Sequence, residues 1–207
     1  NKLVGFNRRF YRGVARLRER LAMGGLKAVY ATMSEDVRRH AERHGPGIVP
    51  HVPAFASSHT LDLLLHLLGP LKVIRIYPWP ERGAVAPFVS VNGVLESETG
   101  CPVFLALNAH DPVQAGLRFL FDDGTSWLLA PLERLSVFEG YDVTPETQGA
   151  AIRRYRPRLL ESVEEDARIK PGLLEQARAF LEGTPRHAAG LADFARVLHL
   201  IDALRGA

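Results

Sequence analysis

The sequence predicts an α+β protein with an open, mostly antiparallel sheet and helices packed on one face of that sheet. Two patterns carry this prediction. Apolar residues recur at helical spacing near both ends of the 207-residue chain, whereas short alternating segments fill its middle, from residue 71 to residue 141. The alternating segments follow one another through short turns, as consecutive hairpins do. Neighbouring strands are therefore expected to run antiparallel.

The N-terminal part of the chain is expected to form three helices and one strand. Residues 9–22 and 35–44 have helical spacing, and residues 27–33 alternate as in a strand. Residues 57–69 (SSHTLDLLLHLLG) carry leucines in nearly every direction, which predicts a buried helix. Gly69, followed at once by a proline, ends that helix.

The middle of the chain is expected to supply the hairpins. Residues 72–79 alternate as in a strand, and the pair Asn92-Gly93 between alternating apolar residues is the strongest short signal for a hairpin turn. Asp123-Gly124 predicts a second turn, and residues 101–109 and 134–141 predict further strands.

The last third of the chain is expected to return to helix. Residues 141–168 are charged and poorly periodic, which predicts a long excursion over the surface. Helical spacing resumes from Pro171 to Gly183 and again from Ala189 towards Gly206.

Composition is ordinary for a globular protein, with 46% hydrophobic and 24% charged residues and a net charge of +3. A single cysteine, Cys101, excludes an intramolecular disulfide, suits a reducing compartment, and is expected to be a small core residue. No segment is apolar for long enough to span a membrane, and none resembles a signal peptide. We therefore expect a cytoplasmic protein without a membrane partner.

The buried helix at 57–69 carries the best clue to function. His59, Asp62 and His66 recur at intervals of three and four residues, so they share one face of an apolar helix. Ser57 and Ser58 are good N-cap residues, which predicts that His59 lies in the first helical turn. There the positive end of the helix dipole favours a neutral imidazole, which can accept a proton.

Asp62 lies one turn further on, where it can orient the His59 ring or bond neighbouring backbone groups, and His66 is interpreted as structural. A second interpretation stays open: a histidine on a core helix is often a satisfied structural residue without a chemical task.

Two other patterns point to sites that the sequence argues against. His40 and His44 have the spacing of two metal ligands on a helix, but arginines surround them, so no metal site is expected. Arginines cluster at residues 16–20 and 153–158, and Tyr155 is interleaved with the second cluster, as in surfaces that stack nucleic-acid bases. Acidic residues are almost as numerous as basic ones, 23 against 26, so nucleic acid is an unlikely partner.

Three segments together resemble a known family. VGFNRRF (4–10), the helix at 57–69 and LADFARVLHLIDAL (191–204) are similar, in order and spacing, to the C-terminal part of the Gfo/Idh/MocA family of glucose–fructose oxidoreductases and inositol dehydrogenases. The resemblance implies that residues 1–8 are a remnant of the last strand of a Rossmann domain. It also implies that residues 9–207 form the C-terminal α+β substrate and oligomerisation domain.

The resemblance implies a chemistry as well. The family transfers a hydride between a sugar, cyclitol or nucleotide-sugar carbon and NAD or NADP, and His59 matches the histidine that takes or gives the hydroxyl proton. Ser58 and Asp62 would support it from the substrate side, and Asn7 and Arg8 would face cofactor or substrate at the domain junction. The family commonly has an aspartate four residues before the histidine, where this chain has Phe55.

The sequence contains neither a Gly-rich dinucleotide fingerprint nor the family's Glu-Lys-Pro motif. We therefore expect NAD(P) in the full-length protein, no tight binding by this chain alone, and no turnover without a Rossmann half. A homo-oligomer formed through the exposed sheet face is also expected. The alternative is a non-catalytic oligomerisation or saccharide-binding module, which Phe55 favours.

Overall fold

The computed structural model describes residues 3–80, 89–109, 115–145, 152–183 and 187–206. An eight-stranded sheet with the order β2-β3-β4-β1-β5-β6-β7-β8 organises the chain. Its strands are β1 (Leu26–Glu35), β2 (Leu71–Pro80), β3 (Val89–Ser97), β4 (Pro102–Ala109), β5 (Gly116–Phe121), β6 (Thr125–Leu129), β7 (Arg134–Thr144) and β8 (Arg154–Glu164). All neighbouring strands are antiparallel except β1 and β4, so the predicted α+β class and mostly antiparallel sheet are confirmed.

β1 lies in the middle of the sheet rather than at its start. Val29 is opposite Val103 of the parallel strand β4 and opposite Phe119 of the antiparallel strand β5. Strands β4 and β5, although consecutive in the chain, therefore do not pair, and the prediction of an unbroken series of hairpins is wrong at this point. β1 can occupy a central place because Val29, Ala31 and Met33 are all buried on one face of it.

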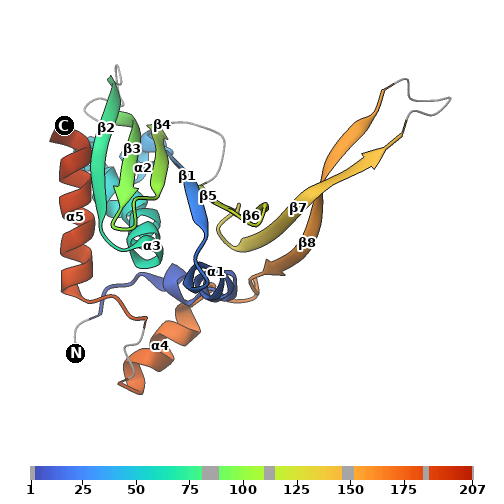
Figure 1. Ribbon diagram of the computed structural model, residues 1–207. Coiled ribbons are helices and arrows are strands. Elements are labelled where there is room, and N and C mark those ends of the chain that lie inside the picture. The colour runs from blue at the N-terminus through green and yellow to red at the C-terminus, as the bar shows by residue number, and fades with distance from the viewer. Residues whose placement is uncertain (1–2, 81–88, 110–114, 146–151, 184–186, 207) are drawn as a thin grey trace.

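The helices gather on one side of the sheet, except for α4, which lies apart at the bottom of Figure 1 and contacts η1. They are α1 (Arg12–Ala22), α2 (Val37–His44), α3 (Ser58–Leu68), α4 (Leu173–Leu181) and α5 (Leu191–Gly206), with the 3-10 helices η1 (Asn7–Phe10) and η2 (Pro46–His51) and the π-helix η3 (Pro53–Ser57). Alternating strand residues show the two faces: Val29 and Val103 are fully buried, whereas their neighbours Tyr30 and Phe104 are 44% and 38% exposed and stack on each other. We call the helix-free side the outer face.

Most of the predicted helices are confirmed at nearly the predicted bounds. The amphipathic spacing that predicted them also explains their packing, because α1 buries Val14 and Leu17 and α5 buries Val197 and Ile201. Cys101 is 5% exposed, as expected for a core residue. Among the described helices, none combines the length and apolar character that a membrane crossing requires.

The predicted turn at Asn92-Gly93 is wrong, because both residues lie inside β3 and pair with neighbours on both sides. A Cβ on Gly93 would lie 3.3 Å from the backbone oxygen of Arg75, so glycine here permits close approach of β2. The turn between β3 and β4 instead uses Gly100, whose φ is +80°.

The predicted surface excursion at 141–168 is also wrong where residues 141–144 and 154–164 form strands. β7 and β8 pair from Arg134 opposite Glu164 to Thr144 opposite Arg154. Figure 1 shows this pair leaving the body of the molecule as a long two-stranded extension. The sequence did not show a strand pattern here because both faces of the β7–β8 pair are exposed, so neither face has to be apolar.

The segment expected to be a strand remnant, residues 1–8, is described from residue 3 onward. Val4 forms an isolated antiparallel bridge with Ala189, and its amide donates to the Ala189 carbonyl at 2.9 Å. The chain then enters η1 at Asn7. These contacts attach the N-terminal segment to the start of α5.

Candidate active site

Helix α3 carries the predicted site residues, but it begins differently from the prediction. The π-helix η3 runs directly into it, and Ser57, at the junction, is itself helical with φ −64° and ψ −23°. The Ser57 hydroxyl does not cap the helix. It donates instead to Glu35 Oε1 at 2.7 Å. Ser58 is buried inside the first turn. The predicted N-cap is therefore wrong, since a preceding helical turn already occupies the end of α3.

His59 is half-buried, and its ring meets Phe6 edge-on, with 5.4 Å between ring centroids. Burial lowers the pKa of His59 to about 4, with further lowering from the positive charges of Arg8 and Lys170. Its imidazole is therefore neutral at pH 7, as the sequence predicted. The cause is desolvation and neighbouring cations rather than a free helix N-terminus.

Asp62 is not the partner of His59. Its carboxylate receives two hydrogen bonds from Arg9, at 2.8 Å from Nε and 2.5 Å from Nη2, in a pair that is almost fully buried. Burial raises the pKa of Asp62, and the Arg9 guanidinium opposes that rise. Arg9 Nη2 also lies 3.4 Å from Oδ1 of Asp193, at the start of α5. Arg9 therefore joins η1 to α3 and α5. Among the described side chains, none hydrogen-bonds the His59 ring.

Arg8 and Asn7 diverge, although they are neighbours in the chain. Arg8 Nη1 donates to Thr60 Oγ1 at 2.6 Å, which brings its charge to the N-terminal turn of α3. Asn7 is buried and donates through Nδ2 to the Pro171 carbonyl at 2.7 Å. Of the two residues predicted to face a ligand, Arg8 lines a cavity and Asn7 anchors the segment before α4.

The cavity beside Arg8 has a volume of about 370 Å³. Its polar lining residues come from η1, β1, α3 and the segment before β7: Arg8, Ser34, Glu35, Thr60 and Glu133. Its apolar lining residues are Ala56, Ala115, Pro131 and Leu132. A cavity of this size accommodates a small-molecule ligand, and its few converging polar groups would orient one.

Glu35, Thr60 and Glu133 were not identified from the sequence. Glu35 ends β1, and burial raises the pKa of its carboxyl group, opposed by the Ser57 hydrogen bond and by Arg8. Thr60 follows His59 directly, so its position beside a candidate base was the only sequence signal. Glu133 lies 98 residues after Glu35, and no local pattern connects them.

Phe55 lies away from this cavity. It is 51% exposed and packs edge-on against the rings of His40 and His44, at 5.7 and 5.3 Å between centroids. The two histidines that had metal-ligand spacing thus surround a phenyl ring. The described residues hold no cluster of three or more metal-ligating side chains.

The site therefore combines a neutral, half-buried imidazole with a polar cavity that shares Arg8 with it. A neutral imidazole can accept a proton from a hydroxyl group near neutral pH. Arg8 can donate to an anionic or hydroxyl oxygen, and the two carboxyl groups can bond hydroxyls as donors or acceptors according to protonation.

No family model and no curated protein matches the chain. Several solved structures do match it. A dehydrogenase from Chromobacterium violaceum is 17% identical, with a TM-score of 0.61 over 98% of this chain and 59% of its own. UDP-N-acetylglucosamine 3-dehydrogenase from Acidithiobacillus ferrooxidans is 17% identical, with a TM-score of 0.62 over 97% of this chain and 59% of its own.

A levoglucosan dehydrogenase solved with NADH is also 17% identical, with a TM-score of 0.63 over 98% of this chain and 62% of its own. The chain thus spans about three-fifths of the length of these enzymes. At these identities the likeness is one of fold, and it agrees with the predicted C-terminal domain. This chain has the α+β fold found in Gfo/Idh/MocA-type dehydrogenases.

Proposed function

We propose that this chain is the substrate domain of an NAD(P)-dependent dehydrogenase that acts on a hydroxyl group of a sugar, cyclitol or nucleotide sugar. The observation that carries the proposal is the neutral imidazole of His59. His59 is not itself a lining residue of the cavity, but it directly precedes the lining residue Thr60, and the charge of the lining residue Arg8 helps to lower its pKa. The similar structures support the substrate class: one is a UDP-sugar dehydrogenase and another a levoglucosan dehydrogenase.

In this proposal His59 accepts the hydroxyl proton of the substrate and returns it in the reverse direction. The hydride chemistry at the same carbon would be supplied by a nicotinamide held outside this chain. Arg8 and Thr60 would position the substrate, and Arg8 would also favour an anionic group such as a diphosphate. Ser58 and Asp62 would act indirectly, by holding α3 in place.

The described residues do not fit NAD(P) by themselves. The sequence has no Gly-rich dinucleotide turn, and β1, the strand before α2, belongs to the mostly antiparallel sheet rather than to a βαβ unit. We therefore assign the dinucleotide to a Rossmann domain joined before residue 9, and only the substrate and proton side to this chain. The protein in which both parts occur is proposed to act in the cytoplasm.

The experiment is a kinetic comparison in the protein that carries both domains. His59→Ala should lower kcat by about 10²–10⁴-fold, the usual contribution of a general base, with unchanged circular dichroism. A matched control is His51→Ala, which alters an exposed histidine away from the cavity and should leave kcat unchanged. Turnover of His59→Ala close to that of the wild type would overturn the catalytic assignment.

One observation favours a second candidate, a saccharide-binding module without chemistry. Phe55 occupies the position of the expected carboxylate, and the Asp62 carboxylate is hydrogen-bonded to Arg9 instead. His59 therefore lacks an acidic partner among the described residues. The two candidates differ in a simple test. A binding module would retain a sugar ligand, detected by shifts of the Thr60 amide in NMR spectra, while the protein with both domains showed no turnover with any NAD(P)-linked sugar.

A further inference from the structure

The segment that connects β8 to α4, residues 165–172, is fixed at both ends to the candidate site; we call this segment the strap. At its first end, the Glu165 amide donates to the carbonyl of Glu133, a lining residue of the cavity, at 2.9 Å. At its last end, the Pro171 carbonyl accepts from Asn7 Nδ2 at 2.7 Å. Both anchors belong to parts of the chain that form the site, so the strap has a defined position beside it.

The last end of the strap packs closely on η1. A Cβ on Gly172 would overlap the backbone oxygen of Asn7, so this approach requires glycine. Asn7 follows Phe6, whose ring contacts the ring of His59. Lys170 lies two residues before Gly172 on the strap, and this packing places it on the His59 side of the site.

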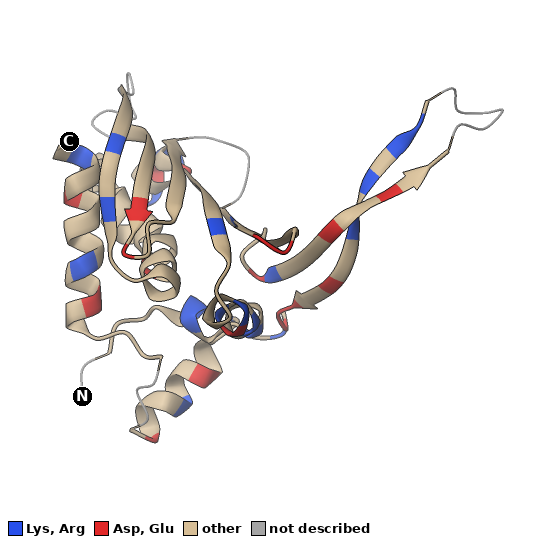
Figure 2. Ribbon diagram, in the orientation of Figure 1, with Lys and Arg blue, Asp and Glu red and all other residues tan. Residues whose placement is uncertain are grey.

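Two cations from different segments act on His59. Arg8 on η1 and Lys170 on the strap are the charged groups that lower the pKa of its imidazole, in addition to the larger effect of burial. Lys170 is exposed, so a ligand in solvent can reach it. Figure 2 shows positive charge on η1 and at the start of α1. The surroundings of His59 are therefore cationic.

Neither of these cations is neutralised by a carboxylate. Among the residues that the structure describes, the ion pairs of η1 and of the start of the strap use Arg9 and Arg12. Arg8 donates instead to the hydroxyl group of Thr60, and Lys170 has no ion pair within the described ranges. Two like charges beside one half-buried ring oppose its protonation, and a bound anion would offset both of them.

The cavity lining carries the opposite charge. Glu35 and Glu133 both line the cavity, and the charge of Arg8 acts on Glu35 as well as on His59. The site is therefore electrically asymmetric, with cations at His59 and carboxyl groups in the cavity. An anionic group is attracted to the first part and repelled from the second, whereas hydroxyl groups can bond in either. These charges favour one orientation of a ligand that carries a single anionic group.

We propose that Lys170 and Arg8 together bind an oxyanion of the substrate, a carboxylate or a phosphate, beside His59, which makes an anionic sugar the substrate class. This inference rests on the proposed function for the reacting hydroxyl group. The anion also assists the chemistry. A base with a pKa of about 4 is weak at pH 7, and offsetting the two cations raises its proton affinity towards the range in which general bases are effective.

The first test measures anion binding to the whole chain at pH 7 by NMR, with the His59 ring signals identified by their loss in His59→Gln. Inorganic phosphate should shift these signals in a saturable way. Sodium chloride at the same ionic strength should not, because it acts by screening alone. Trifluoroacetate, a carboxylate that stays ionised, distinguishes a carboxylate site from a phosphate site. The absence of saturable binding by both anions would overturn the proposal.

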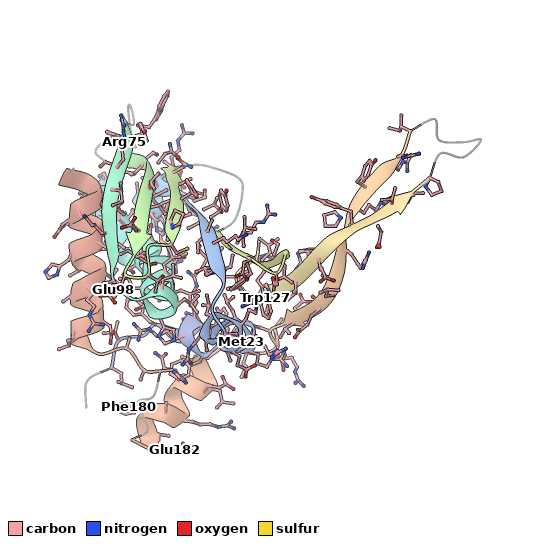
Figure 3. All side chains as sticks on the ribbon, in the orientation of Figure 1. Met23, Arg75, Glu98, Trp127, Phe180 and Glu182 are labelled. Atoms are coloured by element: carbon pink, nitrogen blue, oxygen red, sulfur yellow. The ribbon has the colours of Figure 1, made fainter. Side chains whose placement is uncertain are left out.

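Lys170→Gln should weaken phosphate binding by about tenfold, as expected for the loss of one charge-assisted contact, and should raise the pKa of His59 in the free chain. Lys27→Gln is the matched control, since Lys27 lies eight residues, about 26 Å, from Glu35 on β1. Arg75→Gln, at the top of β2 in Figure 3, reports the effect of net charge alone. Equal affinity in Lys170→Gln and the wild type would contradict the role of Lys170. Circular dichroism confirms that each variant is folded.

The kinetic test uses the protein that carries both domains and compares glucose, glucuronate and glucose 1-phosphate. Lys170→Gln should raise KM for the anionic sugars by about tenfold and change kcat less, whereas His59→Ala lowers kcat. Turnover of glucose as efficient as that of both anionic sugars, with kcat still dependent on His59, would overturn this inference and leave the proposed function intact. Phosphate binding that depends on Lys170, without turnover of any NAD(P)-linked sugar, would contradict the proposed function and leave the anion site.

Discussion

Arg9 and Asp62, 53 residues apart in the sequence, form a bidentate ion pair that is almost completely withdrawn from water. The pair connects η1 to α3, and Asp193 extends it to α5. Because His59 and Thr60 lie within one turn of Asp62, this pair holds the candidate site in register with Arg8. Removal of either charge leaves the other buried and uncompensated.

Asp62→Ala should therefore lower the free energy of unfolding by about 3–5 kcal/mol. Asp193 remains close to Arg9 and moderates the loss, which places the expected value near the lower end. Urea denaturation followed by circular dichroism measures it. Asp166→Ala, which removes an exposed ion pair with Arg168, should leave the midpoint unchanged. Equal losses in the two variants would contradict the role assigned to the buried pair.

His59 and His66 should each contribute a loss of stability as the pH falls from about 6.5 to about 4, opposite in sign to the contribution of Glu35. Burial lowers the pKa of His59 and of His66 to about 4, below the ordinary value of 6.5. In this interval the unfolded chain binds more protons than the folded chain, so acidification favours unfolding. Urea midpoints between pH 7 and pH 4 measure this decline as the difference between the wild type and a variant that lacks one of the two histidines.

His66→Leu should flatten that decline. His66 Nε2 is the buried side-chain polar atom left without a hydrogen-bond partner among the described residues, so leucine removes an unsatisfied group as well as a titrating one. Met23→Leu, at an exposed position and without a titratable group, is the control and should leave the pH dependence as it is in the wild type. A decline of equal steepness in His66→Leu would contradict the prediction.

Glu35→Gln should stabilise the chain at pH 7 and have less effect near pH 4. Burial raises the pKa of the Glu35 carboxyl group, so the unfolded chain releases this proton more readily and stability is lost as the pH rises above the ordinary pKa. Glutamine avoids that cost and still offers an oxygen to the Ser57 hydroxyl. Thermal unfolding at the two pH values tests it. A destabilisation at pH 7 would show that the charge of Glu35 is needed.

Gly172→Ala should destabilise the start of α4. Gly172 has φ +70°, and a Cβ there would lie 2.2 Å from the backbone oxygen of Asn7. Gly24 has a similar φ of +79° but open space around it, so Gly24→Ala reports the backbone strain alone, about 1–2 kcal/mol. Gly172→Ala should cost clearly more in thermal unfolding. Equal costs would show that the segment at Asn7 moves aside freely.

Local pattern accounts for much of this fold. Amphipathic spacing located the helices, because one face of each must meet the sheet, and alternation located most strands. Alternation failed where both faces of the β7–β8 ribbon are exposed, since no burial then imposes a polar–apolar pattern. The turn predicted at Asn92-Gly93 is wrong for a related reason. Glycine occurs both in turns and where two strands approach closely, and the sequence around Gly93 does not show that β2 lies against it.

Some features of the candidate site follow from the sequence, and others depend on the tertiary structure. The sequence by itself determined that α3 is buried and that His59 lies on it, because both follow from the apolar residues around it. It also predicted a neutral imidazole, but from the helix dipole, whereas burial and the charges of Arg8 and Lys170 lower the pKa of His59. The tertiary structure decided that Asp62 pairs with Arg9 rather than His59, and that Glu35, Thr60 and Glu133 line one cavity with Arg8. Such contacts join residues far apart in the chain, and their geometry depends on packing that no local spacing encodes.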